Sequence, residues 1–169
     1  MRNPKRIRSY ATRLLSTALL ISACQFPICR PAQAASWGSI QPLKSRRAEV
    51  ERLLGKPVNE SSAGDSTLHY NVSGGNVTVS FVTAKFVATK KLSPDLEGTV
   101  LLIVLQHERS SDTPDSMGLP KNRDFDRQGG DDVAIYSNMK DGIVYTFIGG
   151  KLKTSRYSAS SDELLRARK

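Results

Sequence analysis

The sequence predicts an α+β domain built on an antiparallel sheet of about six strands, with one short helix and a short C-terminal helical turn. Three observations predict this fold. The run Val100–Leu105 is entirely apolar and lies between Gly98 and a charged segment, which is typical of a strand covered on both faces. Apolar and polar residues alternate on both sides of a turn at residues 73–76, as in a β-hairpin. Beyond residue 132, two glycine turns separate three more strand-like segments.

The first predicted element is a short helix, Arg46–Leu54. Val50, Leu53 and Leu54 fall at i, i+3 and i+4 and share one face, and Gly55 is a suitable C-terminal stop. A helix of nine residues is too short to persist in water by itself. We therefore expect this face to lie on the sheet, and the replacement Leu53→Ala to be among the costliest for stability.

The next predicted strands are Leu68–Val72 and Val77–Phe81, joined as a hairpin. An extension of the second strand through Lys85–Lys91 fits the pattern, and Val100–Leu105 follows as the central strand. The segment before the helix, which holds Trp37, the only tryptophan, is expected to cover the core.

The segment Ser110–Asp132 interrupts this regularity, because it is rich in Ser, Asp, Pro, Gly and Arg and poor in apolar residues. Loops of more than about 15 residues without periodicity are uncommon in compact domains, so this segment (110–132) is either mobile or functional. After it, Val133–Ser137, Ile143–Ile148 and Lys151–Ser158 form a predicted meander. Ser160, with a glutamate three residues later, begins a helical turn with capping-box spacing.

Residues 1–34 have the parts of a secretory signal peptide. Five basic residues precede the apolar stretch Leu14–Ala23, and an Ala-x-Ala cleavage sequence ends at Ala34. The apolar stretch is about half of the ~20 residues that a membrane span needs. We therefore expect cleavage after Ala34 and export of residues 35–169 as one domain, periplasmic or secreted.

Lipidation is the alternative. The tetrapeptide Ile21-Ser22-Ala23-Cys24 resembles a lipobox, after which bacterial lipoproteins are cut and their cysteine is lipidated. In that case the protein is a membrane-anchored lipoprotein that begins at Cys24. Cleavage after Ala34 instead removes both Cys24 and Cys29, so the exported domain has neither a thiol nor a disulfide.

The basic balance of the chain comes largely from the same segment. Residues 1–34 hold six of the 25 Lys and Arg residues and no acidic residue, so their removal lowers the net charge from +9 to +3. The remaining chain has no basic stripe interleaved with aromatic residues. We therefore expect no nucleic-acid partner, and we expect no cofactor.

Several short motifs resemble those of a group of small exported bacterial proteins of uncharacterised function. The motifs are Trp37-Gly38, Ile40 with Pro42-Leu43, Val50 with Leu53-Leu54-Gly55 and Pro57, Gly142-Ile143 with Tyr145, and Gly149-Gly150-Lys151. The first half is similar, more loosely, to SmpA/OmlA-type outer-membrane assembly lipoproteins and to β-lactamase-inhibitor-protein repeats, in which a helix ending Leu-Gly-x-Pro precedes an antiparallel sheet. The resemblance implies this fold, but it implies no activity and no catalytic residue. Such relatives carry cysteines after the helix and at the C-terminus that this chain lacks, so a shared disulfide is absent.

Arg46 and Arg47 lie in the first turn of the predicted helix, where free N–H groups and the helix dipole attract anions. They are candidates for contact with a carboxylate or phosphate of a partner. The alternative is that Arg47 pairs with Glu51 at i, i+4 and that Arg46 is solvated.

The segment 124–129 begins like a calcium loop, with oxygen donors at positions 1, 3 and 5 and glycine at position 6. Position 12 is Ile135 instead of the bidentate glutamate that the ion requires. An acidic turn without metal is therefore favoured over a weak calcium site. The candidate ligands of such a site are Asp124, Asp126, Asp131 and Asp132.

His69 and His107 are the only histidines, so a histidine-dependent hydrolase must use one of them. The sequence contains neither a Gly-x-Ser-x-Gly nor a His-Glu-x-x-His motif. His107 and Glu108 are adjacent at a strand end and so point to opposite faces. We expect both histidines to be structural or solvated, and the protein not to be an enzyme.

These observations favour an exported, non-enzymatic binding or structural protein of the cell envelope. Its partner is another protein or an envelope component, bound through the sheet face or the 110–132 segment. The alternatives are a lipid-anchored envelope assembly factor, if Cys24 is the first residue, and an envelope hydrolase that uses His69 or His107.

Overall fold

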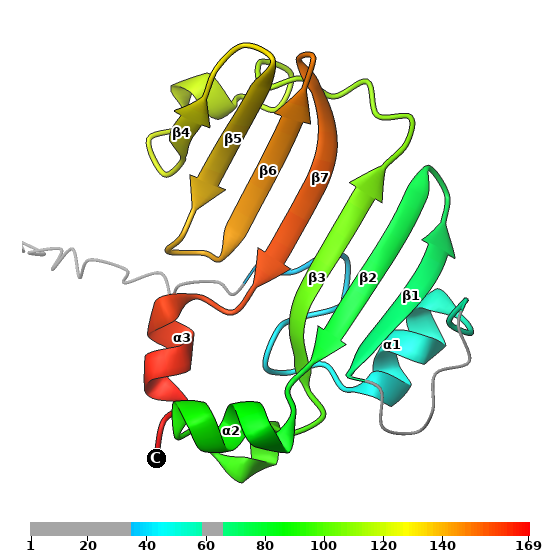
Figure 1. Cartoon of the computed structure of the whole chain (residues 1–169), viewed down its shortest axis with the longest axis vertical. Coiled ribbons are helices and arrows are strands. Elements are labelled where there is room, and N and C mark those ends of the chain that lie inside the picture. The colour runs from blue at the N-terminus through cyan, green and yellow to red at the C-terminus, as the bar shows by residue number, and fades with distance from the viewer. Residues whose placement is uncertain (1–34, 59–65) are drawn as a thin grey trace, which may run out of the picture. The chain divides into compact units, whose positions relative to one another are not determined.

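The computed structural model describes residues 35–58 and 66–169, and the predicted signal segment, with Cys24 and Ala34, lies outside them. The described residues form an α+β fold around a seven-stranded antiparallel sheet of order β1-β2-β3-β7-β6-β5-β4 (Figure 1). The strands are β1 Thr67–Val72, β2 Gly75–Phe81, β3 Val100–His107, β4 Asp126–Gly129, β5 Val133–Asn138, β6 Ile143–Ile148 and β7 Lys151–Ser158. The sheet therefore has one strand more than the six predicted.

Three short α-helices and two 3-10 turns accompany the sheet. They are α1 Arg47–Leu54, α2 Ala84–Lys90, η1 Pro94–Leu96, η2 Leu119–Lys121 and α3 Ser161–Arg166. None of the helices in the described part of the chain has the length and hydropathy of a membrane span.

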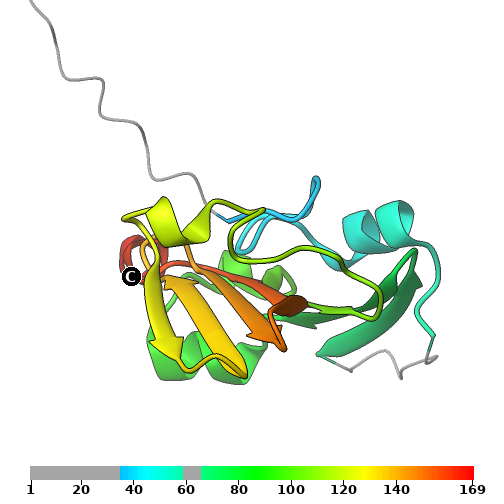
Figure 2. The same ribbon diagram turned by 90° about the horizontal axis from the view of Figure 1, so that it is seen from above.

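One face of the sheet carries the main buried cluster. Figure 2 shows α1, the segment 35–45 and the β3–β4 connection on this side of the sheet. Ile40 and Val50 from this cover pack onto buried side chains of β1, β2 and β3, and the half-buried Trp37 packs against the same cluster. The segment that holds Trp37 therefore covers the core, as predicted.

The β3–β4 connection covers a second cluster over β5 and β6. Its residues Leu119 and Phe125 pack against Tyr136 and Phe147, whose rings meet edge to face with centroids 5.7 Å apart. Much of the segment predicted as a mobile or functional loop, 110–132, is thus a packed cover. A few well-spaced apolar residues are sufficient for this role.

Strand β3 contains the predicted run Val100–Leu105, but only one of its faces is fully covered. Val100, Ile103 and Leu105 are buried, whereas Val104 on the other face is half-buried. The prediction of a strand covered on both faces is therefore wrong for the second face. The helix and the connections that cover β3 lie on one side of the sheet.

The residues predicted to extend the second hairpin strand form α2 instead. Their β-branched and aromatic residues favour a strand locally, but Thr83 caps a helix because its Oγ1 accepts the Phe86 N–H at 3.1 Å. Lys91 ends the helix in the left-handed conformation, with a φ of 54°. Val87 joins a third buried cluster with residues of η1 and α3. Capping and tertiary packing override the strand propensity here.

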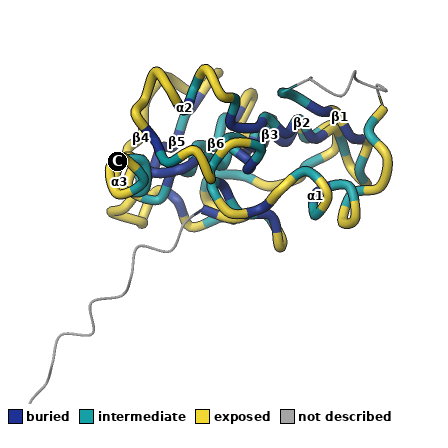
Figure 3. The backbone as a smooth tube through the Cα atoms, turned by 90° about the horizontal axis from the view of Figure 1, so that it is seen from below, coloured by how far each residue is buried: buried dark blue, intermediate teal, exposed yellow. Residues whose placement is uncertain are grey.

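The seventh strand, β4, lies inside the segment predicted as a loop. It pairs with β5 at the edge of the sheet. All four of its residues are exposed, and Figure 3 draws the exposed parts of the described chain in yellow. No apolar alternation marks the strand in the sequence, because it has no buried face. A short, charged and exposed edge strand is also a poor template for pairing with another chain.

Helix α1 begins one residue later than predicted, with Arg46 at its N-cap. Val50 is fully buried and Leu54 packs against the main cluster, but Leu53 is 43% exposed. A two-turn helix touches the sheet along one narrow line, and Val50 occupies that line. The prediction that Leu53 anchors the helix is therefore wrong.

Helix α3 has the predicted capping box. Ser160 Oγ accepts the Glu163 N–H at 3.2 Å, and Glu163 Oε2 accepts the Ser160 N–H at 2.9 Å. Leu164 packs into the third cluster with α2, whereas Leu165 points to solvent. The predicted C-terminal turn is confirmed.

Candidate functional site

The side chains that alternate with the core residues form a second face of the sheet, which we name the open face. Figure 1 views the sheet from this side, with α1 behind it. Strand register and burial assign to this face Leu102, Val104, Gln106, Val133, Ile135, Val144, Thr146, Ile148, Thr154 and Arg156. None of these ten residues is fully buried, whereas Ser137, which lies opposite Val144 on the same face, is buried.

Aliphatic side chains gather on the open face over β5 and β6. Val133 lies directly opposite Ile148 in the strand register, and Ile135 lies opposite Thr146. Val133 is exposed and Ile148 is 50% exposed. Single exposed aliphatic side chains are common on protein surfaces, but the facing pair Val133 and Ile148, with Ile135 two residues along the same strand face, forms a contiguous apolar patch.

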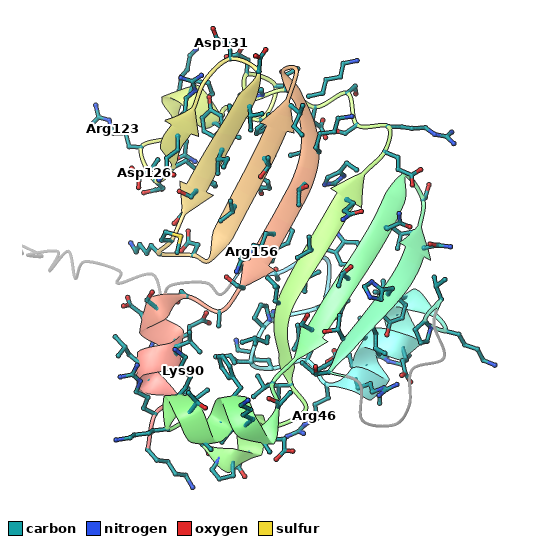
Figure 4. All side chains as sticks on the ribbon, in the orientation of Figure 1. Arg46, Lys90, Arg123, Asp126, Asp131 and Arg156 are labelled. Atoms are coloured by element: carbon teal, nitrogen blue, oxygen red, sulfur yellow. The ribbon has the colours of Figure 1, made fainter. Side chains whose placement is uncertain are left out.

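Arg156 lies on β7 between this patch and β3. Its register partners are Val144 on β6 and Val104 on β3, and Figure 4 shows its place on the strand. The side chain is exposed, and no carboxylate among the described residues lies within ion-pair distance of it. A guanidinium beside aliphatic side chains can bind a carboxylate through two parallel hydrogen bonds.

The covered face holds a histidine–serine contact that the sequence did not predict. His107 Nε2 lies 2.8 Å from Ser155 Oγ across the β3–β7 pair. Burial lowers the pKa of His107, and the charge of Asp112 opposes that shift. A histidine beside a serine hydroxyl can act as a general base for a nucleophile. Ser155 is only 2% exposed, however, so a substrate cannot reach its hydroxyl in this arrangement.

The second histidine lies elsewhere. His69 is exposed on β1, and its Nδ1 lies 3.0 Å from Thr78 Oγ1 on β2. It alternates with Leu68 and Tyr70, which are buried on the covered face, so it belongs to the opposite face from His107. The two histidines therefore cannot act on one substrate.

Arg46 and Arg47, the candidate anion contacts, have different partners. Arg47 Nε pairs with Glu51 Oε1 at 2.8 Å, which is the i, i+4 alternative. Arg46 donates from Nη2 to the Asp95 carbonyl at 2.8 Å and from Nη1 to the Glu97 carbonyl at 3.2 Å. Neutral carbonyl groups leave the charge of Arg46 uncompensated, so of the two arginines only Arg46 lacks an ion-pair partner within residues 35–58 and 66–169.

The candidate calcium ligands are not grouped together in the described part of the chain. Asp126 lies in β4 opposite Ser137, and Asp131 lies 3.6 Å from Arg127 Nη2. Figure 4 shows Asp126 and Asp131 at different ends of β4. Within residues 35–58 and 66–169, no three His, Cys, Asp or Glu side chains are grouped closely enough to hold a metal ion. Asp124 and Asp132 are likewise exposed residues of this stretch.

The sequence singled out neither Arg156 nor Ser155. Arg156 occupies a polar position of an alternating strand, where it resembles any solvated charge. Ser155 is 48 residues from His107, and no local motif connects them. The neighbours of both residues become apparent only from the strand order β3-β7-β6, which short-range patterns do not specify.

No protein-family model matches the chain, and no curated protein matches it. Among solved structures, a DUF4309 family protein (YjgB) from Bacillus subtilis subsp. subtilis str. 168 is similar over 73% of this chain and 84% of its own, with 12% sequence identity and a TM-score of 0.47. That likeness is too distant to place this chain in a family.

Proposed function

We propose that this protein is an exported, non-enzymatic binding protein of the bacterial cell envelope that holds a partner protein on the open face of its sheet. The observation that carries the proposal is Arg156, an exposed cation that is bordered by aliphatic side chains and has no ion-pair partner among the described residues. Arginine is enriched among the few interface residues that supply most of the binding energy.

The chemistry of this surface specifies the partner. Covering Arg156 without an acceptor would leave a desolvated charge, which costs several kcal/mol. The partner must therefore present a carboxylate to Arg156 and apolar side chains to the patch around Val133 and Ile148. Such a pairing also fixes the orientation of the partner, because the guanidinium binds a carboxylate in a planar geometry.

Site-specific photo-crosslinking tests this proposal. A photoreactive amino acid is introduced at Ile148, which is 50% exposed on the open face, or at Leu53, which is 43% exposed on α1. In envelope fractions, we expect a discrete crosslinked protein from position 148 and not from position 53. The substitution Arg156→Glu should abolish that crosslink. Identical products from both positions, or products unaffected by Arg156→Glu, would show that the open face is not the binding site.

The proposal includes export through residues 1–34 and cleavage after Ala34, with lipidation at Cys24 as the alternative. Support comes from the order of basic, apolar and small residues in this segment. The intact mass of the protein recovered from expressing cells distinguishes the cleaved form from the lipidated form. Cleavage predicts Ala35 as the first residue and no incorporation of labelled palmitate, whereas lipidation predicts palmitate that Cys24→Ala removes.

The contact of His107 with Ser155 favours a second candidate, an envelope hydrolase. In it, His107 would take the proton from the Ser155 hydroxyl, which lies 2.8 Å away. Ser155, which is 2% exposed, would first have to become accessible to the substrate. A panel of ester and amide substrates tests this reaction: activity that both His107→Ala and Ser155→Ala abolish supports it, and activity unaffected by either substitution refutes it.

A further inference from the structure

One end of the fold, formed by η1, α2, α3 and the residues before α1, is strongly basic, and we name it the basic end. Its cations are Lys44, Arg46, Lys85, Lys90, Lys91, Arg166, Arg168 and Lys169. Only four acidic residues lie on the same segments, whereas the other described residues hold eleven cations and ten acids. The excess positive charge of the described chain is therefore concentrated at this end.

The described part of the chain does not neutralise the cations of the basic end. All eight are exposed, and none lies within ion-pair distance of a carboxylate of the described residues. Two of the four local carboxylates bind other donors: Asp95 Oδ2 accepts from Ser93 Oγ at 3.3 Å, and Glu163 completes the capping box of α3. These acids serve the local fold and leave the positive charges available.

Backbone hydrogen bonds hold the segments of the basic end together. Lys169 N–H donates to the Lys91 carbonyl at 3.1 Å, and Ser93 N–H donates to the Ala167 carbonyl at 2.9 Å. Figure 4 shows Lys90 and Arg46 at this same end of the structure. Cations from three separate segments therefore lie at one end of the fold, which these hydrogen bonds hold together.

The basic end also has exposed apolar residues. Leu165 is 56% exposed on α3, next to Arg166. A hollow of about 390 Å³ opens between the residues before α1, η1 and α3. Its lining includes the apolar residues Leu43 and Leu96, the cations Lys44 and Arg166, and Glu163 of the capping box. An exposed leucine among cations matches the requirements of a lipid interface, where aliphatic groups enter the acyl boundary and cations contact the head groups.

We infer that the basic end docks on an anionic phospholipid membrane. This inference is independent of the open-face partner, because the basic end uses different residues and a different ligand. Cations close to an anionic bilayer each strengthen binding by about fivefold, and the effect weakens with added salt. A soluble polyanion would use the cations but would gain nothing from Leu165.

Binding of the full chain to vesicles tests the inference. Vesicles of phosphatidylcholine alone are compared with vesicles that contain about 30% phosphatidylglycerol, at low and physiological salt. The test variant carries Lys85→Gln, Lys90→Gln, Arg166→Gln and Arg168→Gln. A matched control variant loses four exposed cations elsewhere, through Lys121→Gln, Arg123→Gln, Lys140→Gln and Lys151→Gln. Circular dichroism checks that both fold.

We expect binding only to the anionic vesicles, a loss of more than about tenfold in the test variant, and a change of less than about twofold in the control. Residues 1–34 carry six further cations, but their contribution is common to every variant. Equal losses in both variants would mean that net charge, not the basic end, drives binding, and would overturn the inference. Leu165→Gln should weaken binding severalfold at constant charge. If it does not, and long-chain polyphosphate binds as tightly as the vesicles, the ligand is a soluble polyanion and membrane docking is wrong.

Discussion

The replacement Tyr70→Phe should stabilise the protein, although it removes a polar group from a buried residue. Tyr70 lies on β1, is 1% exposed, and its hydroxyl has no hydrogen-bond partner among the described residues. Burial raises the pKa of Tyr70, with further effects from the charges of Glu51, which raises it, and Arg47, which lowers it. The hydroxyl thus lies near the ion pair of α1 without bonding to it.

The magnitude follows from that unpaired hydroxyl. A buried polar group without a partner costs about 1–3 kcal/mol, and phenylalanine keeps the ring while it removes this cost. The small void left by the missing oxygen loses some dispersion contacts, and this loss offsets part of the gain in stability. We expect a net gain of about 1 kcal/mol in the free energy of unfolding, which shifts the urea midpoint upward by about 0.5 M at an unchanged slope.

A matched control removes a buried hydroxyl that does have a partner. Ser155 is 2% exposed and contacts His107 Nε2 at 2.8 Å, so Ser155→Ala should lower the free energy of unfolding by about 1–2 kcal/mol. Urea unfolding of both variants, followed by circular dichroism, therefore gives shifts of opposite sign. A loss of stability of more than about 0.5 kcal/mol in Tyr70→Phe would show that the hydroxyl has a bonding partner, and would refute the reasoning.

Three further predictions concern the core, a turn and the pH dependence. Val50→Ala should lower the free energy of unfolding by about 2 kcal/mol because it opens a cavity in the main cluster, whereas Leu53→Ala should lower it by less than about 1 kcal/mol. Urea unfolding measures both variants, and the reverse order would contradict the packing of α1. Gly142→Ala should cost more than about 3 kcal/mol, since the φ of Gly142 is 73° and the new Cβ would lie 2.0 Å from a carbonyl oxygen of β7. Gly149→Ala, at a φ of 58° in open space, should cost only about 1 kcal/mol. Thermal unfolding compares the two variants, and equal losses of stability would be inconsistent with the clash. Because burial lowers the pKa of His107, the unfolded chain binds a proton more readily than the folded chain. The contribution of His107 to stability should therefore be complete above the ordinary histidine pKa of about 6.5 and fall as the pH drops below it. His107→Gln should remove this part of the pH dependence, and an unchanged pH profile of stability in this variant would contradict the role of His107.

The strands of the hairpin and the meander could be predicted because their signals are local. Alternation of apolar and polar residues and glycine turns lie within a few residues of each other, and β1, β2, β5, β6 and β7 all form where these signals predict them. Strand β4 has no buried face and therefore no alternation. Helix α2 was missed because its residues favour a strand locally, and the helix depends on the Thr83 cap and on packing of Val87 in the third cluster.

The candidate site was less predictable than the fold, because each of its parts depends on neighbours distant in sequence. Arg156 becomes distinctive only when β6 and β3 place Val144 and Val104 on either side of it. The sequence likewise does not distinguish Arg46 from Arg47, because both lie in the first turn of the predicted helix. Arg47 finds Glu51 one turn away, but the partner carbonyls of Arg46 lie about 50 residues further along the chain.

The open face follows from the small amount of covering structure in the chain. Seven strands at a spacing of about 4.8 Å make a sheet about 29 Å wide, whereas a helix covers a strip about 10 Å wide. Helix α1 and the two covering segments are therefore committed to one face, and the other remains in contact with water. Over β1 and β2 that face carries polar residues such as His69, Thr78 and Ser80, as solubility requires. Over β5 and β6 it carries Val133 and Ile148 instead, which solubility does not explain. This contrast within a single face is a second reason, beside the exposed Arg156, for placing the proposed partner protein over β5, β6 and β7.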